Sequence, residues 1–584
     1  MAKLTPSQRR KKSEFIRNQA ADVALGRPHV AQTPNGDEQK FAVPNRTGLG
    51  NYSKGLPHIA VDDPLAPGQV EPDKYRQFVR SLDAGDSDDF GDIPCNSGAQ
   101  FRKLVNPQAG QAFDLEGPDA QAVALPPPPG ISSLEAGAEM AELYWMVLLR
   151  DVQLDAFNTN PLATDAANDL SGYEFFQSIE PNQQVTTATL FRATAAGARN
   201  GGYVSQFLLI GNNEYNSNGL TNPPTALDGL LKYGAFYLSQ KLKSAADGKD
   251  YMKTEPCWLD IQNGKKASAS DIFLPERRFI TTPRDLATYV HFDALYEAYL
   301  NACWYLLNEN DPGNKKTQLY KFGPGNPYND SDNQEGFGTY GGPHILSLVT
   351  EVATRALKCV WFQKWQVHRR LRPEAFAGRV HFHLKSGRKL YGQQGLDEVI
   401  NPTLLDDLST GKLGSHYGPG AGKTGSYFLP QAFPEGSPMH PSYGAGHATV
   451  AGACVTVLKA FFDETAVFLK PVRVKLASNG QSLGQTLEFV PNPTAQPLTV
   501  GGELNKLAAN VSVGRNMAGV HYWSDDFHSR NLGEQIAIGI LQEQSLTYNE
   551  KRASGGETYF TFTRFDGRTK VTIADGEVFE APVA

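Results

Sequence analysis

The stretch HPSYGAGHATVAGACV, residues 440–455, carries the clearest structural pattern in this 584-residue chain. Its second half, residues 448–454, is made of small apolar residues and is typical of a buried helix. The glycine turn before it, which includes Gly446, predicts exposed backbone N–H groups at the start of that helix. Because a helix N-terminus attracts negative charge, the turn suits an oxyanion, although an ordinary glycine-rich turn explains the same letters. The histidines that flank it, His440 and His447, favour the anion site.

Upstream, the segment KWQVHRRLRPE, residues 364–374, ends a strongly helical run. It contains Lys364 and Arg372, and we expect the proline after Arg372 to end the helix. Cations suit an oxyanion ligand, but positive charge in a last turn also suits the helix dipole. A surface helix with a cationic end is therefore the alternative interpretation.

Downstream, RNMAGVH spaces Arg515 and His521 across a break between two helical segments, and Asp525 follows four residues after the histidine. The arginine offers a fork of donors, and the imidazole can act as a nucleophile or a metal ligand. A packed histidine beside two aromatic residues is the alternative interpretation.

Together, K-x7-R-P, G-x-G-H and R-x5-H-x3-D in this order resemble the active-site motif shared by vanadium haloperoxidases and the related histidine acid phosphatases. The flanking text, GFGTYGGPHILSLVTEVATRALK and HPSYGAGHATVAGACV, resembles red-algal and cyanobacterial bromoperoxidases over much of residues 280–545. The resemblance implies a vanadate cofactor and oxidation of bromide, with iodide and chloride as further candidates, by hydrogen peroxide. The hypohalous acid formed would halogenate small organic nucleophiles. The alternative is an acid-phosphatase-type phosphohydrolase with a phosphohistidine at His521.

The resemblance also implies roles for individual residues. His521 would bond the vanadium, His447 would act as general acid and base beside the cofactor, and Asp525 would orient His521. Lys364 is expected to take part in catalysis as well as in binding. The oxygens of vanadate would be neutralised by Lys364, Arg372, Arg515 and the backbone N–H of Gly446, with His447 near the apical oxygen.

Three positions form the expected halide pocket. Ala445 stands where relatives commonly carry a serine whose hydroxyl reaches the oxyanion, which puts vanadate affinity in doubt. Trp361, one helical turn before Lys364, resembles the fungal chloroperoxidase choice, whereas His440 resembles the red-algal bromoperoxidase choice. Halide preference is mixed on this basis, and helix packing is the alternative explanation for the tryptophan.

A second metal site is a further hypothesis. Residues 329–333 offer several oxygen ligands, and Asp330 and Asp332 among them could hold calcium, as some relatives do at a neighbouring loop. A polar turn explains the same residues.

We expect a mainly α protein in which helical bundles form the vanadate pocket. Residues 1–130, rich in Gly, Pro, Asp and Asn, predict a long irregular arm that wraps a partner subunit. The catalytic domain is expected over 131–584, with its motif-bearing core at 280–545. Predicted helices cover 134–157, beginning with a capping box of Ser132 and Glu135, then 225–242, 285–308 and 345–371. The helix over 285–308 is expected to follow a cap at Thr282, with Pro283 at the first helical position. Small β-hairpins are predicted after 472–476, with Asn479-Gly480 as the turn, and over 557–575, with Asp566-Gly567 as the turn.

Composition narrows the partners. The 55 basic and 62 acidic side chains give a net charge of −7, which argues against nucleic acid. The five cysteines lie far apart without a C-x-x-C pair, and no window approaches the roughly 18 apolar residues of a membrane span. The basic N-terminus lacks the apolar segment of a signal peptide, so a soluble protein, cytoplasmic by default, is expected. The resemblance implies a homo-oligomer built from dimers, with a dodecamer as one candidate.

Overall fold

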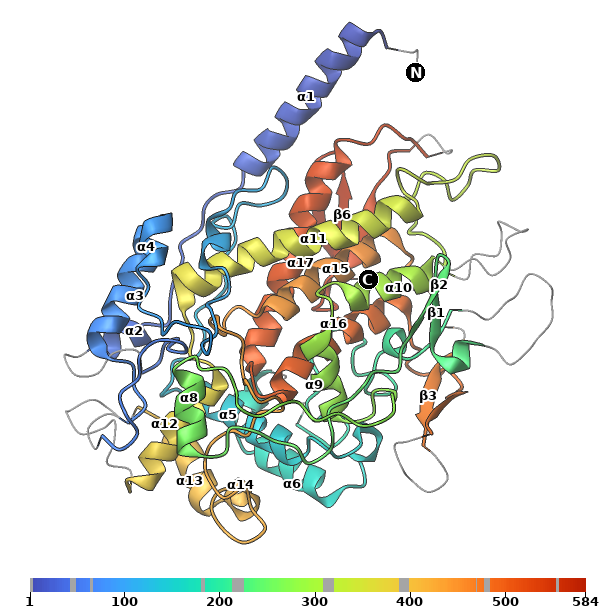
Figure 1. The fold of residues 1–584 in the computed structure, drawn as a ribbon. Helices are drawn as coiled ribbons and strands as arrows, with labels where there is room; N and C mark the ends of the chain where they lie inside the picture. Colours follow the sequence, from blue (N-terminus) through green and yellow to red (C-terminus); the bar gives the residue numbers. More distant parts are fainter. Residues whose placement is uncertain are drawn as a thin grey trace.

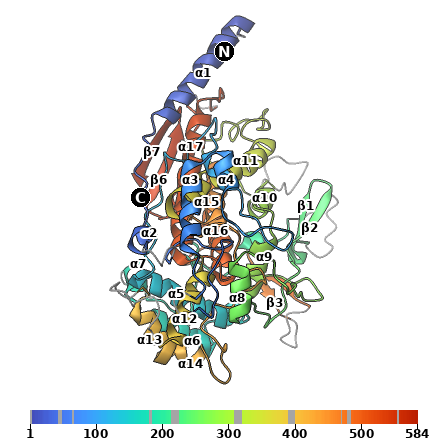
Figure 2. The same ribbon diagram turned by 60° about the vertical axis from the view of Figure 1, so that its left-hand side comes forward.

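The computed structural model describes residues 4–42, 49–63, 67–179, 184–212, 225–307, 320–387, 399–468, 470–476, 484–552 and 556–583. Within these ranges the protein is mainly helical and has three small antiparallel sheets. Helices from the second half of the chain form its centre, and N-terminal segments lie along one side (Figure 1, Figure 2). The expected mainly α fold is confirmed.

The centre is built around α15 (Gly446–Phe461), which packs against α11 (Gly342–Phe362), α16 (Val500–Met517) and α17 (Trp523–Ser545). Every residue of α15 except His447 is buried. A Cβ atom added to Gly452 would lie 2.0 Å from the carbonyl oxygen of Arg530, and one added to Gly533 would lie 2.0 Å from that of Thr449. The two helices therefore cross at a distance that only glycine permits, and the starts of α15 and α17 are held together.

The segment after α11 differs from the expected single helix. The α-helical pattern changes to a π-helix, η5 (Gln363–His368), after which Arg369 adopts a left-handed conformation with φ 43°. Pro373 does not end a helix; it occupies the first turn of α12 (Pro373–Lys385), where its fixed φ and missing N–H are tolerated. Lys364 and Arg372 consequently lie on either side of a break.

Two other predicted helices are confirmed with changed boundaries. The helix expected over 134–157 is α5 (Leu134–Leu148), and its cap is Ser133, whose hydroxyl accepts from the N–H of Ala136, rather than Ser132. The helix expected over 285–308 is two helices, α9 (Pro283–Phe292) and α10 (Glu297–Leu306). The predicted cap before α9 is confirmed as a capping box between Thr282 and Asp285.

The helix predicted over 225–242 is wrong. This segment forms a short 3-10 turn, η4 (Thr225–Asp228), followed by a hairpin of β1 (Leu230–Tyr233) and β2 (Phe236–Ser239). Gly229 and Gly234 both have positive φ, at 65° and 59°, and these conformations break a helix while fitting a tight turn. The apolar residues of the segment suit either structure, so the glycines decide.

Both predicted hairpins are present. Strand β3 (Val472–Lys475) pairs with β4 (Thr486–Phe489), while the predicted turn at Asn479-Gly480 lies outside the described residues. Strand β5 (Phe560–Thr563) pairs with β6 (Thr569–Ala574), with Phe560 opposite Ile573 and Gly567 in the turn at φ 68°. A third strand, β7 (Glu577–Pro582), extends this sheet beyond the prediction.

The first 130 residues contain more helix than we expected. Helix α1 (Pro6–Leu25) begins with a capping box between Thr5 and Gln8, has no buried residue and projects away from the body (Figure 1). The chain from 7 to 25 contains neither glycine nor proline, which explains why it is helical. Shorter helices follow: α2 (Asp37–Lys40), α3 (Pro72–Ala84), α4 (Ser87–Gly91) and η1 (Pro107–Gln111).

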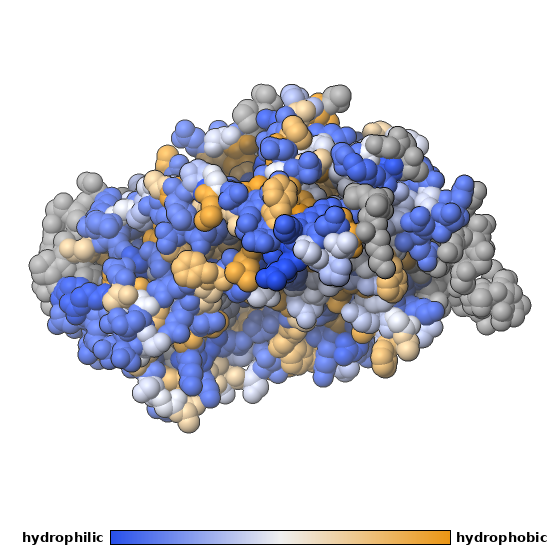
Figure 3. Space-filling view, turned by 90° about the horizontal axis from the view of Figure 1, so that it is seen from above, coloured by the Kyte–Doolittle hydropathy of each residue, from blue (hydrophilic) through white to orange (hydrophobic). Residues whose placement is uncertain are grey.

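The remaining elements are short and lie around the centre: η2 (Leu154–Ala156), α6 (Pro161–Leu170), α7 (Glu174–Ile179), η3 (Gln206–Leu208), α8 (Glu255–Gln262), α13 (Pro402–Thr410) and α14 (Lys412–His416). From above, the surface is largely hydrophilic with scattered apolar residues (Figure 3). In the part of the chain that the structure describes, no helix is both long and apolar enough to cross a membrane. All five cysteines are free.

Candidate functional site

Two buried cations approach the glycine turn before α15. The Lys364 ammonium, carried by the π-helix, donates to the carbonyl oxygens of Pro441 and Ser442 at 2.8 and 3.1 Å. The Arg372 guanidinium, at the N-cap of α12, donates to the carbonyl oxygens of His440 and Val520 at 2.9 and 2.7 Å. These neutral carbonyl groups satisfy part of the hydrogen-bonding capacity of Lys364 and Arg372 but do not balance the positive charge of the two side chains.

A third cation, Arg515 in the last turn of α16, lies in the same cluster. It donates to the carbonyl oxygen of Val290 at 2.9 Å, and its buried Nε has no hydrogen-bond partner among the described residues. Burial lowers the pKa of Arg515, and it lowers the pKa of Lys364 well below the usual lysine value, with the charge of Arg372 adding to the effect. Burial and the charge of Arg515 likewise lower the pKa of Arg372 to about 10.

The neighbouring Arg370 shows what an ordinary buried arginine looks like in this protein. Its guanidinium donates to the carboxylates of Glu139 and Asp525 at 2.6 and 2.7 Å, and despite burial its pKa is raised. By contrast, across the described ranges, none of the three cluster cations lies within 4.0 Å of a carboxylate oxygen. Because an uncompensated buried charge is costly, the arrangement of these cations suits an anion.

His521 lies between α16 and α17 and faces the cluster with one ring nitrogen. Its Nδ1 lies 2.8 Å from the Asp525 carboxylate, and its Nε2 lies 3.1 Å from Nη1 of Arg372. Burial, with the charge of Arg372 adding to it, lowers the pKa of His521 well below its usual value. The imidazole is therefore neutral, with its proton on Nδ1 and a lone pair on Nε2 toward the cations.

Asp525 is itself fixed from three sides. It accepts from Arg370 and from the Ser442 hydroxyl as well as from His521. Burial alone would raise its pKa, but Arg370 and then His521 hold the pKa of Asp525 well below its usual value. The carboxylate stays ionised and holds the imidazole orientation.

The glycine turn leads into α15 as predicted. Gly446 is the first residue of the helix, and a Cβ atom there would lie 3.1 Å from the Trp361 ring. Ala445 occupies the N-cap position, is buried and caps nothing with its side chain, while its N–H donates to the Ser529 hydroxyl at 2.7 Å. The amides of the first turn have no acceptor within the helix, which suits an anion.

His447, the second residue of α15, has a partner that the sequence did not reveal. Its Nε2 lies 3.1 Å from an oxygen of Asp293, at the break between α9 and α10. The histidine side chain is 22% exposed, whereas that of Asp293 is 5% exposed. The His447 side chain is thus more accessible to solvent than its partner Asp293.

Trp361 and His440 form one wall beside Lys364. Their ring centroids are 4.9 Å apart, and the Lys364 ammonium lies 5.4 Å from the Trp361 ring centroid. The indole N–H donates to the carbonyl oxygen of Val105 at 3.1 Å, and Nδ1 of His440 lies 2.9 Å from Nη2 of Arg372. Burial lowers the pKa of His440 well below its usual value, and Lys364 and Arg372 add to this. The tryptophan both packs against the N-terminal segment and borders the cluster.

The structure therefore brings together most of the predicted residues. Sequence reasoning missed Glu139, Asp293, Arg370 and Ser442; Arg370 and Ser442 lie inside the quoted motifs, whereas no pattern marked Glu139 or Asp293. Asp330 and Asp332, the residues of the predicted calcium site, are exposed and lie outside the three motifs that form the cationic cluster. In the described ranges, no group of three or more His, Cys, Asp or Glu side chains is placed to hold a metal ion.

Comparisons with known proteins identify relatives of the whole chain. The family model described as the VCPO second helical-bundle domain matches residues 412–549. The chain is 38% identical to the vanadium-dependent bromoperoxidase of Corallina officinalis, with 96% of this chain and 98% of that protein covered, and 33% identical to that of Ascophyllum nodosum, with 98% and 94% covered. The fold is similar to a second vanadate-dependent bromoperoxidase of A. nodosum, described as homohexameric, with a TM-score of 0.82, 27% identity and 100% and 94% coverage.

Proposed function

The chain belongs to the vanadium-dependent bromoperoxidase family, and we propose that its buried cationic cluster is the place where this peroxidase holds vanadate. The absence of carboxylate partners around the three cations, within the described residues, carries the proposal. A tetrahedral oxyanion with several negative oxygens would supply the missing charge. Lys364, Arg372, Arg515 and the first amides of α15, beginning at Gly446, would neutralise these oxygens.

The donor set fits vanadate better than a halide or a simple carboxylate. Arginine side chains can hold two oxygens at once, whereas the lysine ammonium acts as a point charge. His521 adds a neutral nitrogen lone pair, which suits a metal rather than an anionic oxygen. When bound, vanadium(V) supplies a Lewis acid that makes peroxide electrophilic toward bromide.

Other residues of the chain would orient the histidine ligand, transfer protons and exclude water. Asp525 keeps the proton of His521 on Nδ1, so that Nε2 stays available as a ligand. His447, paired with Asp293 and partly exposed, would accept a proton from incoming peroxide and return it to a leaving water. Trp361 and His440 would exclude water from the side on which halide approaches.

The alternative activity, phosphate ester hydrolysis through a phosphohistidine at His521, uses the same residues, so one experiment compares them. Protein dialysed against a chelator is divided into two portions. One portion is restored with vanadate and assayed for peroxide-dependent bromination of a phenol dye, and the other, kept free of vanadate, is assayed for hydrolysis of an aryl phosphate. We expect bromination that requires vanadate and that added phosphate suppresses by competition. Bromination by the stripped protein, unaffected by phosphate, would refute the proposal; efficient ester hydrolysis without bromination would favour the phosphatase.

Assembly and organisation complete the proposal. The structurally similar A. nodosum enzyme is described as a homohexamer, whereas the expectation for this chain was a dimer-based assembly with a dodecamer as one candidate; we propose a homo-oligomer for this chain. Helix α1, which has no fully buried residue in its own subunit, suits contact with another copy. We keep a catalytic domain over 131–584 as a proposal. Calcium at Asp330 and Asp332 stays a prediction from the sequence: both side chains are exposed, and neither belongs to a group of three or more described His, Cys, Asp or Glu side chains placed to hold a metal ion.

A further inference from the structure

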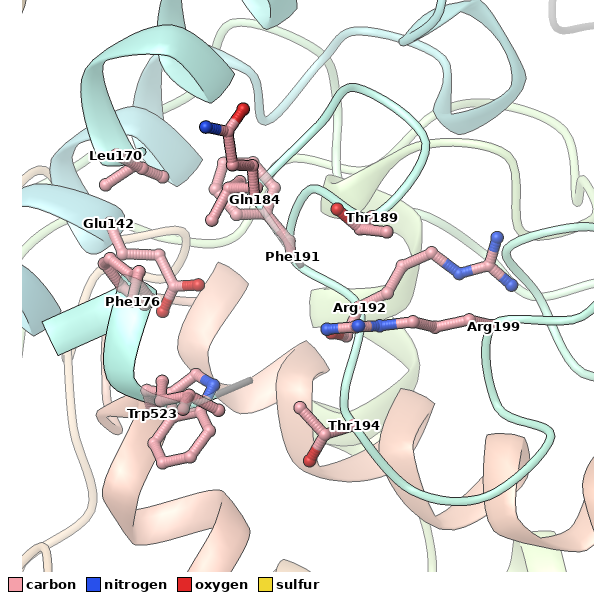
Figure 4. A pocket seen from close by; sticks show the side chains of 12 residues that line it. Glu142, Leu170, Phe176, Gln184, Thr189, Phe191, Arg192, Thr194, Arg199 and Trp523 are labelled. Atoms are coloured by element: carbon pink, nitrogen blue, oxygen red, sulfur yellow. The ribbon is translucent and has the colours of Figure 1, made fainter. Parts of the chain in front are cut away.

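A pocket lined by none of the cations of the cluster lies where the segment 184–199 meets α5, α6, α7 and the start of α17 (Figure 4). Water-sized molecules can occupy about 40 Å³ of it. Since one water needs roughly 10–15 Å³ measured in this way, the pocket has room for about three or four waters, a space that a compact organic ligand of a few carbons could take. None of the residues assigned above to vanadate or halide lines it.

Glu142 is the unexplained group in this pocket. It lies on α5, is 5% exposed, and its Oε2 has no hydrogen-bond partner among the residues that the structure describes. Figure 4 shows its carboxyl group pointing into the space between the pocket walls. Burial, together with the charges of Glu139 and Asp526, raises the pKa of Glu142 to about 8. At neutral pH the group is therefore mostly a neutral acid with one O–H to donate.

Two arginines line the opposite side but point in different directions. The Arg192 guanidinium turns away from Glu142 and donates to the carbonyl oxygens of Ala198, Gly201 and Gly202. The Arg199 side chain runs toward Glu142, and it donates to the carbonyl oxygen of Arg192 at 3.2 Å. A cation and an acid O–H thus face each other across the pocket.

The remaining walls carry the polar side chains of Gln184, Thr189 and Thr194 beside several apolar ones. Leu170, Phe176 and Trp523 lie on the same side as Glu142. An amphipathic ligand could place its charged end between Arg199 and Glu142 and its apolar end against these side chains. A spherical halide would use only the charged part of the pocket.

We propose that this pocket binds a short-chain monocarboxylate, whose oxygens accept from the Arg199 guanidinium and from the Glu142 hydroxyl while its alkyl end contacts the apolar wall. The ligand differs in charge, shape and location from vanadate, so this inference does not depend on the proposed function. It also gives a role to a buried acid that no contact within the described residues explains.

The charges around Glu142 set the expected pH dependence. The charged or titratable groups on the elements packed around it include Glu139 on α5, Asp169 on α6, Glu174 on α7, Asp526 and Arg530 on α17, and Arg192, Arg199 and Tyr203 on the connecting segment. As pH rises through the pKa of Glu142, its ionisation replaces a donor by a negative charge that faces the anion. Carboxylate affinity should therefore fall by about tenfold between pH 7 and pH 9.

The test is a titration of the full-length, vanadate-free protein with propionate, in which binding is measured by saturation-transfer NMR of the ligand methyl protons. Arg199→Gln should weaken propionate by about tenfold or more, because it removes a charged donor. Arg277→Gln, an exposed arginine outside the pocket, is the matched control and should change affinity less than about twofold. Glu142→Gln, which keeps a donor of the same size, should bind propionate with no change between pH 7 and pH 9.

Several results would overturn the assignment. They are an absence of propionate binding to the wild type, equal losses in Arg199→Gln and Arg277→Gln, and displacement of propionate by an equal concentration of chloride. If Arg199→Gln fails to fold, Arg199→Lys keeps the charge without the planar fork and should retain measurable but weaker binding. Wild-type affinity in a folded Arg199→Lys variant, together with a pH dependence in Glu142→Gln identical to that of the wild type, would also contradict the proposal.

Discussion

Lys364→Met tests whether the cationic cluster is built for an anion. Methionine is close to lysine in length and shape but carries no charge, so it removes the ammonium that donates to Pro441 and Ser442. A hydrogen bond to a charged acceptor contributes about 1.5–3 kcal/mol, and 1.4 kcal/mol is a factor of ten. Vanadate should therefore bind roughly ten to 150 times more weakly, as measured by equilibrium titration of stripped protein in phosphate-free buffer.

The same substitution should have little effect on the stability of the vanadate-free protein. Two buried carbonyl groups lose their donor, which costs about 1–3 kcal/mol in the free energy of unfolding for each such group. The substitution also removes an unbalanced buried charge, whose burial costs several kcal/mol, so the two effects oppose each other. Arg370→Met is the matched control, because that arginine is equally buried but pairs with Glu139 and Asp525. Breaking this network should cost about 3–5 kcal/mol in the free energy of unfolding.

The lowered pKa of Lys364 also predicts how the difference in stability between the wild type and Lys364→Met changes with pH. Because burial lowers the pKa of Lys364, the unfolded chain binds more protons than the native one between this lowered value and the usual lysine value. The wild type therefore gains stability from this group as pH rises through that range, and Lys364→Met does not. Denaturant unfolding at several pH values should show the difference shifting in favour of the wild type. Equal destabilisation by Lys364→Met and Arg370→Met, or unchanged vanadate affinity, would refute the reasoning.

Three further predictions concern single side chains of the site. His521→Ala should abolish vanadate binding, whereas His447→Ala should leave vanadate bound and slow turnover by roughly 10²–10⁴-fold, and equal loss of binding in both would contradict the assigned roles. Trp361→Arg should change the ratio of kcat/KM for chloride and bromide, because the indole borders the halide side; an unchanged ratio would leave packing as its only role. Ala445→Ser should tighten vanadate by about tenfold through a new donor at the helix start, and unaltered affinity in titrations of a folded variant would mean that this side chain does not face the anion.

The fold was predictable where local rules act without competition. The cap at Thr282, the start of α15 at Gly446 and the C-terminal hairpin follow from capping, glycine turns and alternation over a few residues. The hairpin at 230–239 was missed because apolar residues there suit both helix and strand. The π-helix after α11 was missed because hydrophobic periodicity does not distinguish one inserted residue from a continuing helix.

The cations and histidines of the site could be predicted from the sequence, but the acidic residues that orient them could not. Arg372 and His521 belong to short motifs, so their spacing carries information. Asp293 and Glu139 are ordinary acids in sequence, and only the packing of α9 and α5 brings them to His447 and Arg370. Direct contacts with a ligand can therefore be inferred from spacing, whereas the groups that orient those contacts depend on tertiary structure.

The crossing of α15 and α17 has a consequence for how this enzyme can change. Gly452 and Gly533 lie six and twelve residues into the chain beyond Gly446 and His521, yet any side chain at either would push the two helices apart. A saturation mutagenesis library selected for bromination should therefore be as depleted at these two glycines as at the proposed vanadate ligands. New halide preferences would have to arise at positions such as Trp361 and His440, because substitutions at the crossing of α15 and α17 would separate the helices that carry the site.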